Sequence, residues 1–170
     1  MPTRNRWYKL AAFLPPGDRL AVVESDEDER NRWLMMRDAD TGKKREEVAL
    51  PGGATHPSGL LVFPDGSRLL VVVGPSFHVL EPADLTRTPR RVVGPDRAHF
   101  PDLAFHPSGR ILATVGNSWA VRFWDTASWA ESRVFEWGIG KLQAVAFSPD
   151  GTRAAVGSQK GGVMVWDVDL

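Results

Sequence analysis

Four histidines, His56, His78, His99 and His106, are the side chains of this sequence with the broadest catalytic and metal-binding chemistry. None forms an H-x-x-x-H or H-E-x-x-H pair, the spacing that directs two imidazoles at one zinc ion. His56 and His106 each precede Pro-Ser-Gly, a turn-forming sequence, so we interpret them as turn neighbours rather than ligands. The chain has no cysteine, which excludes disulfides, thiol chemistry and zinc sites built on Cys ligands.

Sequence motifs for a catalytic nucleophile or a phosphate-binding loop are as weak as those for a metal site. Gly-x-Ser-x-Gly does not occur, so the local signal of a hydrolase nucleophile is missing. Residues 138–141 read Gly-Ile-Gly-Lys, but the second half of a phosphate-binding loop does not follow, and the segment opens a strand rather than a helix. Carboxylates lie mostly in solvated runs and offer no acid–base pair. The sequence therefore predicts no catalytic residue, no cofactor and no metal site.

The elements that would position any site come from an internal repeat. Four turn sequences of the Pro-Asp-Gly kind recur, with their glycines at Gly17, Gly66, Gly109 and Gly151, in steps of 49, 43 and 42 residues. Proline fixes φ and glycine accepts positive φ, so each turn interrupts a strand. A period of 40 to 50 residues indicates an array of similar supersecondary units.

Apolar residues flank each turn at strand spacing. Six and four residues before the glycines lie Ala11 and Phe13, Leu60 and Val62, Leu103 and Phe105, and Val145 and Phe147. This period of two predicts a strand with one buried face, and an apolar run after each turn (20–23, 69–73, 111–115 and 154–156) predicts a second, buried strand.

A third strand ends in a short signature in the last two repeats, at residues 121–125 (Val-Arg-Phe-Trp-Asp) and 163–167 (Val-Met-Val-Trp-Asp). With these two Trp-Asp pairs 42 residues apart, the sequence resembles the WD-repeat (WD40) family over essentially the whole chain. Arg37-Asp38 and Leu80-Glu81 are the weaker counterparts in the first two repeats. The resemblance implies an all-β fold, a β-propeller whose blades are antiparallel sheets of three to four strands.

The expected architecture is one domain, 1–170, with four blades at residues 7–50, 58–93, 100–136 and 142–170. About 15 strands are expected, because the fourth blade lacks an outer strand and leaves an edge at Val163, Val165 and Trp166. An uncovered edge is a site for pairing with another chain. We therefore hypothesise an eight-blade ring of two chains; a strained four-blade ring and a fragment completed by other blades remain open.

The resemblance also implies a hydrogen-bonded tetrad of His, Ser or Thr, Asp and Trp inside a blade. The positions for its Asp carry Ser118 and Lys160, and no Gly-His dipeptide occurs, so we expect the tetrad to be absent.

The loops that join the second and third strands lie on the same side as the loops between blades, because neighbouring strands are antiparallel. WD-repeat proteins commonly bind partners on this side. We expect Trp119 to project there, since it stands where the fourth repeat has Gly161. The other candidates for protein binding are Trp137, Phe100, His99 and Lys160, with an acidic insertion that contains Asp26, Glu27, Asp28 and Glu29. Trp124 and Trp166 are expected in blade cores.

Composition narrows the function. Lys plus Arg equals Asp plus Glu, 21 each, so no global basic field favours nucleic acid, and no apolar run is long enough to span a membrane. We expect a cytoplasmic, non-catalytic scaffold that presents its loop face to a protein or peptide. One alternative is a self-assembling propeller unit whose main partner is another copy of itself; a propeller-type enzyme is less favoured.

Overall fold

The computed structural model describes residues 6–26, 28, 31–50, 57–94, 99–116 and 119–169, with the backbone alone for 6–8. In these residues there are 15 strands and no helix, as the sequence predicts. The chain divides into two compact units, residues 1–91 and 92–170, and the boundary falls within the eighth strand. The expectation of a single domain over 1–170 stays a prediction.

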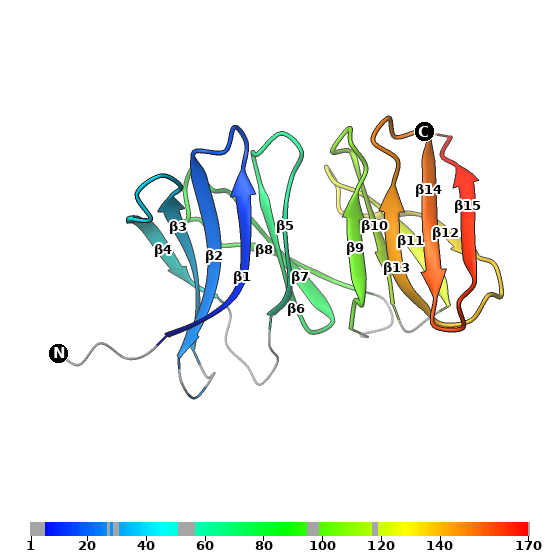
Figure 1. Cartoon of the computed structure of the whole chain (residues 1–170), viewed down its shortest axis with the longest axis horizontal. Helices are drawn as coiled ribbons and strands as arrows, with labels where there is room; N and C mark the ends of the chain where they lie inside the picture. Colours follow the sequence, from blue (N-terminus) through cyan, green and yellow to red (C-terminus); the bar gives the residue numbers. More distant parts are fainter. Residues whose placement is uncertain are drawn as a thin grey trace. The chain divides into compact units, whose positions relative to one another are not determined.

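The first unit carries two four-stranded antiparallel sheets, blades 1 and 2, with strands in chain order (Figure 1). Blade 1 comprises β1 (Arg6–Leu14), β2 (Arg19–Asp26), β3 (Arg32–Asp38) and β4 (Lys44–Ala49). Blade 2 comprises β5 (Pro57–Val62), β6 (Leu69–Val73), β7 (Ser76–Leu80) and β8 (Arg90–Val93).

The second unit carries blades 3 and 4. Blade 3 comprises β9 (Asp102–Phe105), β10 (Ile111–Val115), β11 (Ala120–Asp125) and β12 (Glu131–Glu136). Blade 4 comprises β13 (Leu142–Phe147), β14 (Arg153–Ser158) and β15 (Val163–Asp167), in the order β13-β14-β15. Within the described residues β15 therefore forms the sheet edge, as predicted.

The turn between the first two strands has the same glycine hydrogen bond in every blade, although the Pro15-Pro16 peptide bond in blade 1 is cis. The N–H of each repeat glycine donates to the carbonyl three residues earlier, with Gly17 bonded to Leu14, Gly66 to Phe63, Gly109 to His106 and Gly151 to Ser148, at 2.6 to 2.9 Å. All four glycines have positive φ, between 69° and 114°, where a Cβ would be strained. The repeat seen in the sequence is thus a repeat of backbone geometry.

Each unit has its own apolar core between its two blades. In the first, Ala21, Val23, Leu34 and Met36 of blade 1 pack with residues of blade 2 that include Leu69 and Val71. In the second, the blade 3 residues Ala113, Val115, Val121 and Phe123 pack with Val145, Val156 and Trp166 of blade 4. The blades in each unit are therefore joined face to face by interleaved aliphatic and aromatic side chains.

One prediction about burial is wrong. The sequence assigns Ala11 and Phe13 to the covered face of β1, but both are exposed, Phe13 at 64%. The alternate residues Leu10 and Leu14 face the core of the first unit instead. Both faces of β1 are apolar, so period-two spacing alone does not distinguish the face that another sheet covers.

Candidate protein-interaction surface

Trp119 is the candidate that the structure places most clearly on the surface. It lies directly before β11, at the end of the connection from β10, and is 63% exposed. The strands on either side are buried, with Leu112, Ala113, Val115, Ala120 and Val121 at 0% exposure, so the exposed ring lies beside two buried strands. Tryptophan is enriched among the residues that dominate the binding energy of protein interfaces.

Trp137 belongs largely to the core of the second unit. Its ring is stacked on Phe135, with centroids 5.6 Å apart and planes 3° apart, and it lies 4.4 Å from Trp166. The residue is half-buried, which leaves only part of the indole for an outside partner. Trp137 therefore fastens the loop before β13 to the blade 3–blade 4 core.

His99 and Phe100 were both predicted to contribute to binding, and the structure separates them. His99 is exposed, whereas Phe100 is 7% exposed and cannot offer its ring to a partner without rearrangement. Lys160, in the β14–β15 turn, is exposed and its side-chain carbons lie against Gly140. On this loop side of the second unit, Trp119, His99 and Lys160 remain as accessible candidates.

The acidic insertion is less of a loop than the sequence suggests. Strand β2 extends to Asp26, and Asp26 is 7% exposed, with its carboxylate accepting hydrogen bonds from the backbone and side-chain nitrogens of Asn31 at 3.2 and 2.7 Å. The carboxylate of Asp26 is therefore engaged with Asn31 within the chain and is not exposed for binding a partner. Asp28 is exposed, and Glu27 and Glu29 lie outside the described residues.

The predicted edge in blade 4 shows two kinds of residue. Val163 and Val165 are 69% and 56% exposed, on the face turned away from blade 3. Trp166 points the other way and packs on Phe123, with ring centroids 6.3 Å apart. Only the two valines thus present apolar side chains to solvent, and the edge contribution of Trp166 is limited to its backbone.

Blade 3 contains one pair of the tetrad, while Ser118 at the position for its Asp lies outside the described residues, so the absence of the complete tetrad stays a prediction. The indole N–H of Trp124 donates to the hydroxyl of Thr114 at 3.0 Å, and both side chains are buried. This is the Trp–Thr half of the arrangement that the resemblance implies. In blade 4 the equivalent strand position is Val156, whose side chain has no acceptor for Trp166.

Of the described histidines, His78 and His106 are buried among structural neighbours, whereas His99 is exposed. His106 Nε2 lies 3.0 Å from the carbonyl oxygen of Gly151, and a carbonyl only accepts, so this ring nitrogen carries the proton. Its Nδ1 is then the acceptor for the backbone N–H and the hydroxyl of Ser108, at 3.1 and 2.7 Å. Burial, and then the charge of Arg91, lower the pKa of His78 and favour its neutral form. Among the described residues, no group of three or more His, Cys, Asp or Glu side chains is arranged to hold a metal ion.

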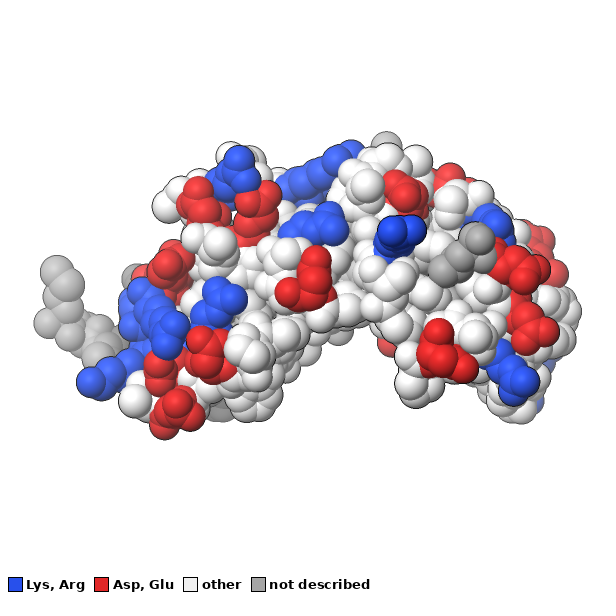
Figure 2. All heavy atoms as spheres, turned by 90° about the horizontal axis from the view of Figure 1, so that it is seen from above, with Lys and Arg blue, Asp and Glu red and all other residues white. Residues whose placement is uncertain are grey.

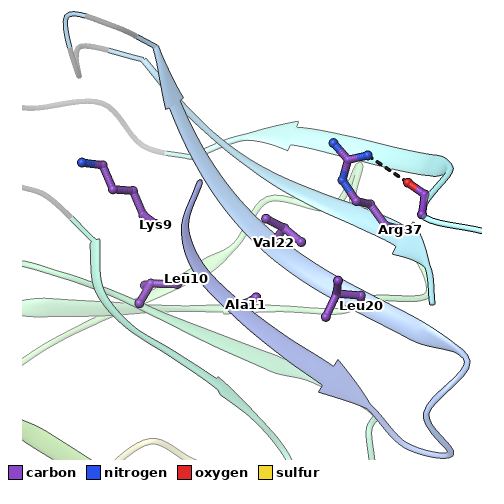
Figure 3. Close-up of a pocket in the computed structure, with 7 residues that line it drawn as sticks. Lys9, Leu10, Ala11, Leu20, Val22 and Arg37 are labelled. Atoms are coloured by element: carbon purple, nitrogen blue, oxygen red, sulfur yellow. Dashed lines mark hydrogen bonds between the residues drawn. The ribbon is translucent and has the colours of Figure 1, made fainter. Parts of the chain in front are cut away.

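Blade 1 carries a hollow of about 450 Å³ on the side opposite blade 2 (Figure 3). Leu10 and Ala11 of β1, Leu20 and Val22 of β2, Lys9, Arg37 and Gly42 line it. Arg37 donates to the carbonyl of Gly42 at 2.9 Å and pairs with the buried carboxylate of Glu24 at 2.9 Å. The hollow is thus apolar at its base and has an anchored guanidinium at one side. The sequence did not indicate it.

On the face that Figure 2 shows, the charges of the described residues indicate no further site. Lys and Arg are interspersed with Asp and Glu over the face that Figure 2 shows, in each of the two units. Many of these charges are locally engaged, such as Arg122 with Glu131 at 2.7 Å. Within the described part of the chain, no helix has the length and apolar character needed to cross a bilayer.

Stacked antiparallel sheets with a shared turn, joined face to face, define this chain as a β-propeller type of protein. The family described as "WD domain, G-beta repeat" matches residues 93–125 and 138–167, which cover blades 3 and 4. The chain belongs to the WD-repeat family.

Relatives and solved structures agree with this assignment. A WD repeat-containing protein, VIP3, of Arabidopsis thaliana is 32% identical in an alignment of 136 positions that covers 68% of this chain and 38% of that protein. Pre-mRNA-processing factor 19 homolog 2 of the same plant is 37% identical over 65 residues, 38% of this chain and 12% of that protein. The chain thus spans less than half the length of the curated relatives it matches.

Two solved structures share the fold at low sequence identity. The β-propeller domain of Cps50 (Swd1) from Myceliophteria thermophila has a TM-score of 0.78 at 16% identity, over 96% of this chain and 52% of that domain. Hydrazine synthase of Kuenenia stuttgartiensis has a TM-score of 0.74 at 14% identity, over 93% of this chain and 58% of that chain. At these identities the likeness concerns the fold alone.

Proposed function

We propose that this chain is a non-catalytic scaffold that binds a protein or peptide through the loop side of its second unit. The observation that carries the proposal is the exposure of Trp119, 63%, at the end of a hairpin connection between two buried strands. Tryptophan is the residue most enriched among those that dominate binding energy at interfaces. The exposed His99 and Lys160 supply polar groups on the same loop side.

A catalytic role has less support from the described side chains. Two buried groups that could exchange protons are engaged structurally: Glu24 pairs with Arg37, and His106 bridges Ser108 and Gly151. The likeness to hydrazine synthase concerns the fold, and folds host unrelated chemistries. A scaffold is therefore the function that the residues support best.

The test compares the full chain with Trp119→Ala and with a control, Val134→Ala. Val134 is 42% exposed on β12, so its truncation also removes exposed apolar surface, but away from the loop side. Proteins retained by the immobilised wild type are identified by quantitative mass spectrometry, and one is purified and titrated against all three chains. We expect Trp119→Ala to weaken binding by about 30-fold or more and Val134→Ala to leave it unchanged. Equal affinity of the wild type and Trp119→Ala would overturn the proposal.

A further inference from the structure

The contact between neighbouring blades repeats in the two units. We call forward face the side of a blade that the next blade of the chain covers. In blade 1 it consists of Ala21, Val23, Leu34 and Met36, and in blade 3 of Ala113, Val115, Val121 and Phe123. All eight residues are at most 2% exposed. The two sets occupy equivalent positions in the two blades. Ala21 is paired with Met36 across two strands of blade 1, and Ala113 is paired with Phe123 across the equivalent strands of blade 3.

The forward face of blade 4 has the same register but no cover. Ala155 pairs with Val165, and Gly157 pairs with Val163, at the positions of the eight buried residues. Val163 and Val165 are nevertheless 69% and 56% exposed. At two of these positions, which are fully covered in blades 1 and 3, blade 4 thus exposes Val163 and Val165, whereas Ala155 and Gly157 are half-buried.

The opposite side of a blade we call the rear face; in blades 2 and 4 it packs on the forward face of the other blade of the same unit. In blade 4 Phe147 of this face lies 5.6 Å, between ring centroids, from Phe123 of blade 3. Phe13 occupies the same position in blade 1, because it pairs with Leu20 as Phe147 pairs with Ala154. Phe13 is 64% exposed and has no such partner sheet.

The hollow in Figure 3 lies on this rear face of blade 1. Arg37 borders the hollow. It is the blade 1 equivalent of Trp166 in blade 4, because Arg37 is paired with Leu20 and Trp166 with Ala154. The rear face of blade 1 thus combines a hollow with one exposed phenyl ring, that of Phe13, whereas Val22 and its pairing partner Met35 on this face are each 3% exposed.

The turn glycines also distinguish blade 1, whose turn meets no neighbouring turn, from blades 2 and 4, whose turns do. A Cβ on Gly66 would lie 3.2 Å from Pro15 of blade 1, and a Cβ on Gly151 would lie 2.4 Å from His106 of blade 3. In both units, therefore, the turn of the second blade contacts the turn of the blade before it. A Cβ on Gly17, in blade 1, would meet nothing within 4 Å.

We propose that the forward face of blade 4 in one copy of this chain packs against the rear face of blade 1 in a second copy. Within each unit, a forward face already packs against a rear face. Every copy carries one further forward face, on blade 4, and one further rear face, on blade 1. The blade 4 end of one copy can therefore pack against the blade 1 end of another, in a head-to-tail arrangement.

The internal contact predicts the details of this interface. Phe13 of one copy covers Val165 of the other, as Phe147 covers Phe123. Val165 and Gly157 are smaller than Phe123 and Val115 at the same positions, which leaves room for the phenyl ring. The Gly17 turn approaches the turn at Ser148, as the Gly151 turn approaches His106.

The experiment measures the mass of the full chain in solution by light scattering and sedimentation at about 10 to 100 μM, the range of moderate interfaces. We expect twice the chain mass of 18.8 kDa. Val165→Glu and Phe13→Glu each place an unpaired charge in the contact, and each should weaken association by about 30-fold or more. Val134→Glu, on an exposed position of β12 outside both faces, should leave the mass unchanged.

Mixing the two variants gives the decisive result. The Val165→Glu chain keeps an intact rear face on blade 1, and the Phe13→Glu chain keeps an intact forward face on blade 4. An equimolar mixture should therefore form a pair through one intact contact, while each variant alone stays monomeric. Circular dichroism of each variant checks that the sheets are retained, because both positions are exposed in the single chain.

A wild-type chain that stays at 18.8 kDa over this concentration range would overturn the proposal. So would an oligomer that persists in Val165→Glu, or a mixture that does not pair. These outcomes leave the proposed scaffold function untouched, because Trp119 lies on neither face.

Discussion

Gly151→Ala is the substitution that tests most directly how blades 3 and 4 are joined. Gly151 has φ +76°, and a Cβ there would lie 2.4 Å from Nε2 and 2.7 Å from Cε1 of the His106 ring. The ring cannot simply move aside, because it is buried, hydrogen-bonded to the Gly151 carbonyl at 3.0 Å and packed edge-on against Phe147 with centroids 5.2 Å apart. The methyl group must therefore break this contact.

The cost follows from two contributions. A left-handed conformation costs an L-residue about 1–2 kcal/mol. Loss of the buried hydrogen bond between His106 and Gly151 adds about 0.5–1.5 kcal/mol, and displacement of the ring from its packing raises the total to about 2–4 kcal/mol. Gly161→Ala is the matched control, because Gly161 has φ +82° and open space within 4 Å, so only the conformational cost of about 1–2 kcal/mol applies.

The assay is urea unfolding followed by tryptophan fluorescence, with amide hydrogen exchange over residues 102–167 because a chain of two units need not unfold in one transition. In a His106→Ala background the clash is gone, and Gly151→Ala should cost no more than about 1–2 kcal/mol. The reasoning fails if Gly151→Ala costs no more than Gly161→Ala, or if its cost is the same with and without the His106 ring.

Three further predictions concern single side chains. Thr114→Val keeps the shape but removes the acceptor for the buried Trp124 indole, so we expect a loss of about 1–3 kcal/mol in urea unfolding and an upfield shift of the indole proton. Glu24→Leu leaves the guanidinium of Arg37 without its buried carboxylate partner and should also cost about 1–3 kcal/mol by thermal or urea unfolding, less at high salt. Hydrogen bonds from the Ser148 hydroxyl and from Thr152 lower the pKa of Asp150 to about 2, so its stabilising contribution is complete above about pH 4 and is lost as pH falls toward 2. Carbon NMR of the carboxyl gives that pKa directly, and Asp150→Asn should flatten this part of the acid unfolding profile; an unshifted pKa would contradict the turn geometry.

Much of the fold was predictable because its signals are local. The turn glycines must adopt positive φ, and apolar residues in alternation form strands, so the repeat itself specifies the order of 15 strands and the three-stranded fourth blade. The register at Arg37-Asp38 was also visible, since Asp38 closes β3 at the position where Asp125 closes β11. The hydrogen bond between Trp124 and Thr114 was missed because it joins two strands, and its partners stand ten residues apart.

The candidate surface was less predictable. The sequence treats Trp119 and Trp137 alike, as loop tryptophans. In the structure Trp119 is 63% exposed, whereas the ring of Trp137 stacks on Phe135 and contacts Trp166 at a tilt. Phe100 and Asp26 were expected at the surface and are buried. Whether each of these side chains is exposed or buried depends on the side chains that pack against it, and those come from other strands.

The sequence by itself determined that this chain is a series of WD-repeat blades, because turns and strand periodicity depend on residues close together in the chain. It also predicted β15 as the outermost strand that the described residues contribute to the fourth blade. Tertiary structure decided which face of each strand is covered, since two apolar faces such as those of β1 are equivalent until a second sheet packs on one of them. Only the packed blades show that Phe13 and Val165 occupy positions that are covered elsewhere in the molecule and open at these two sites.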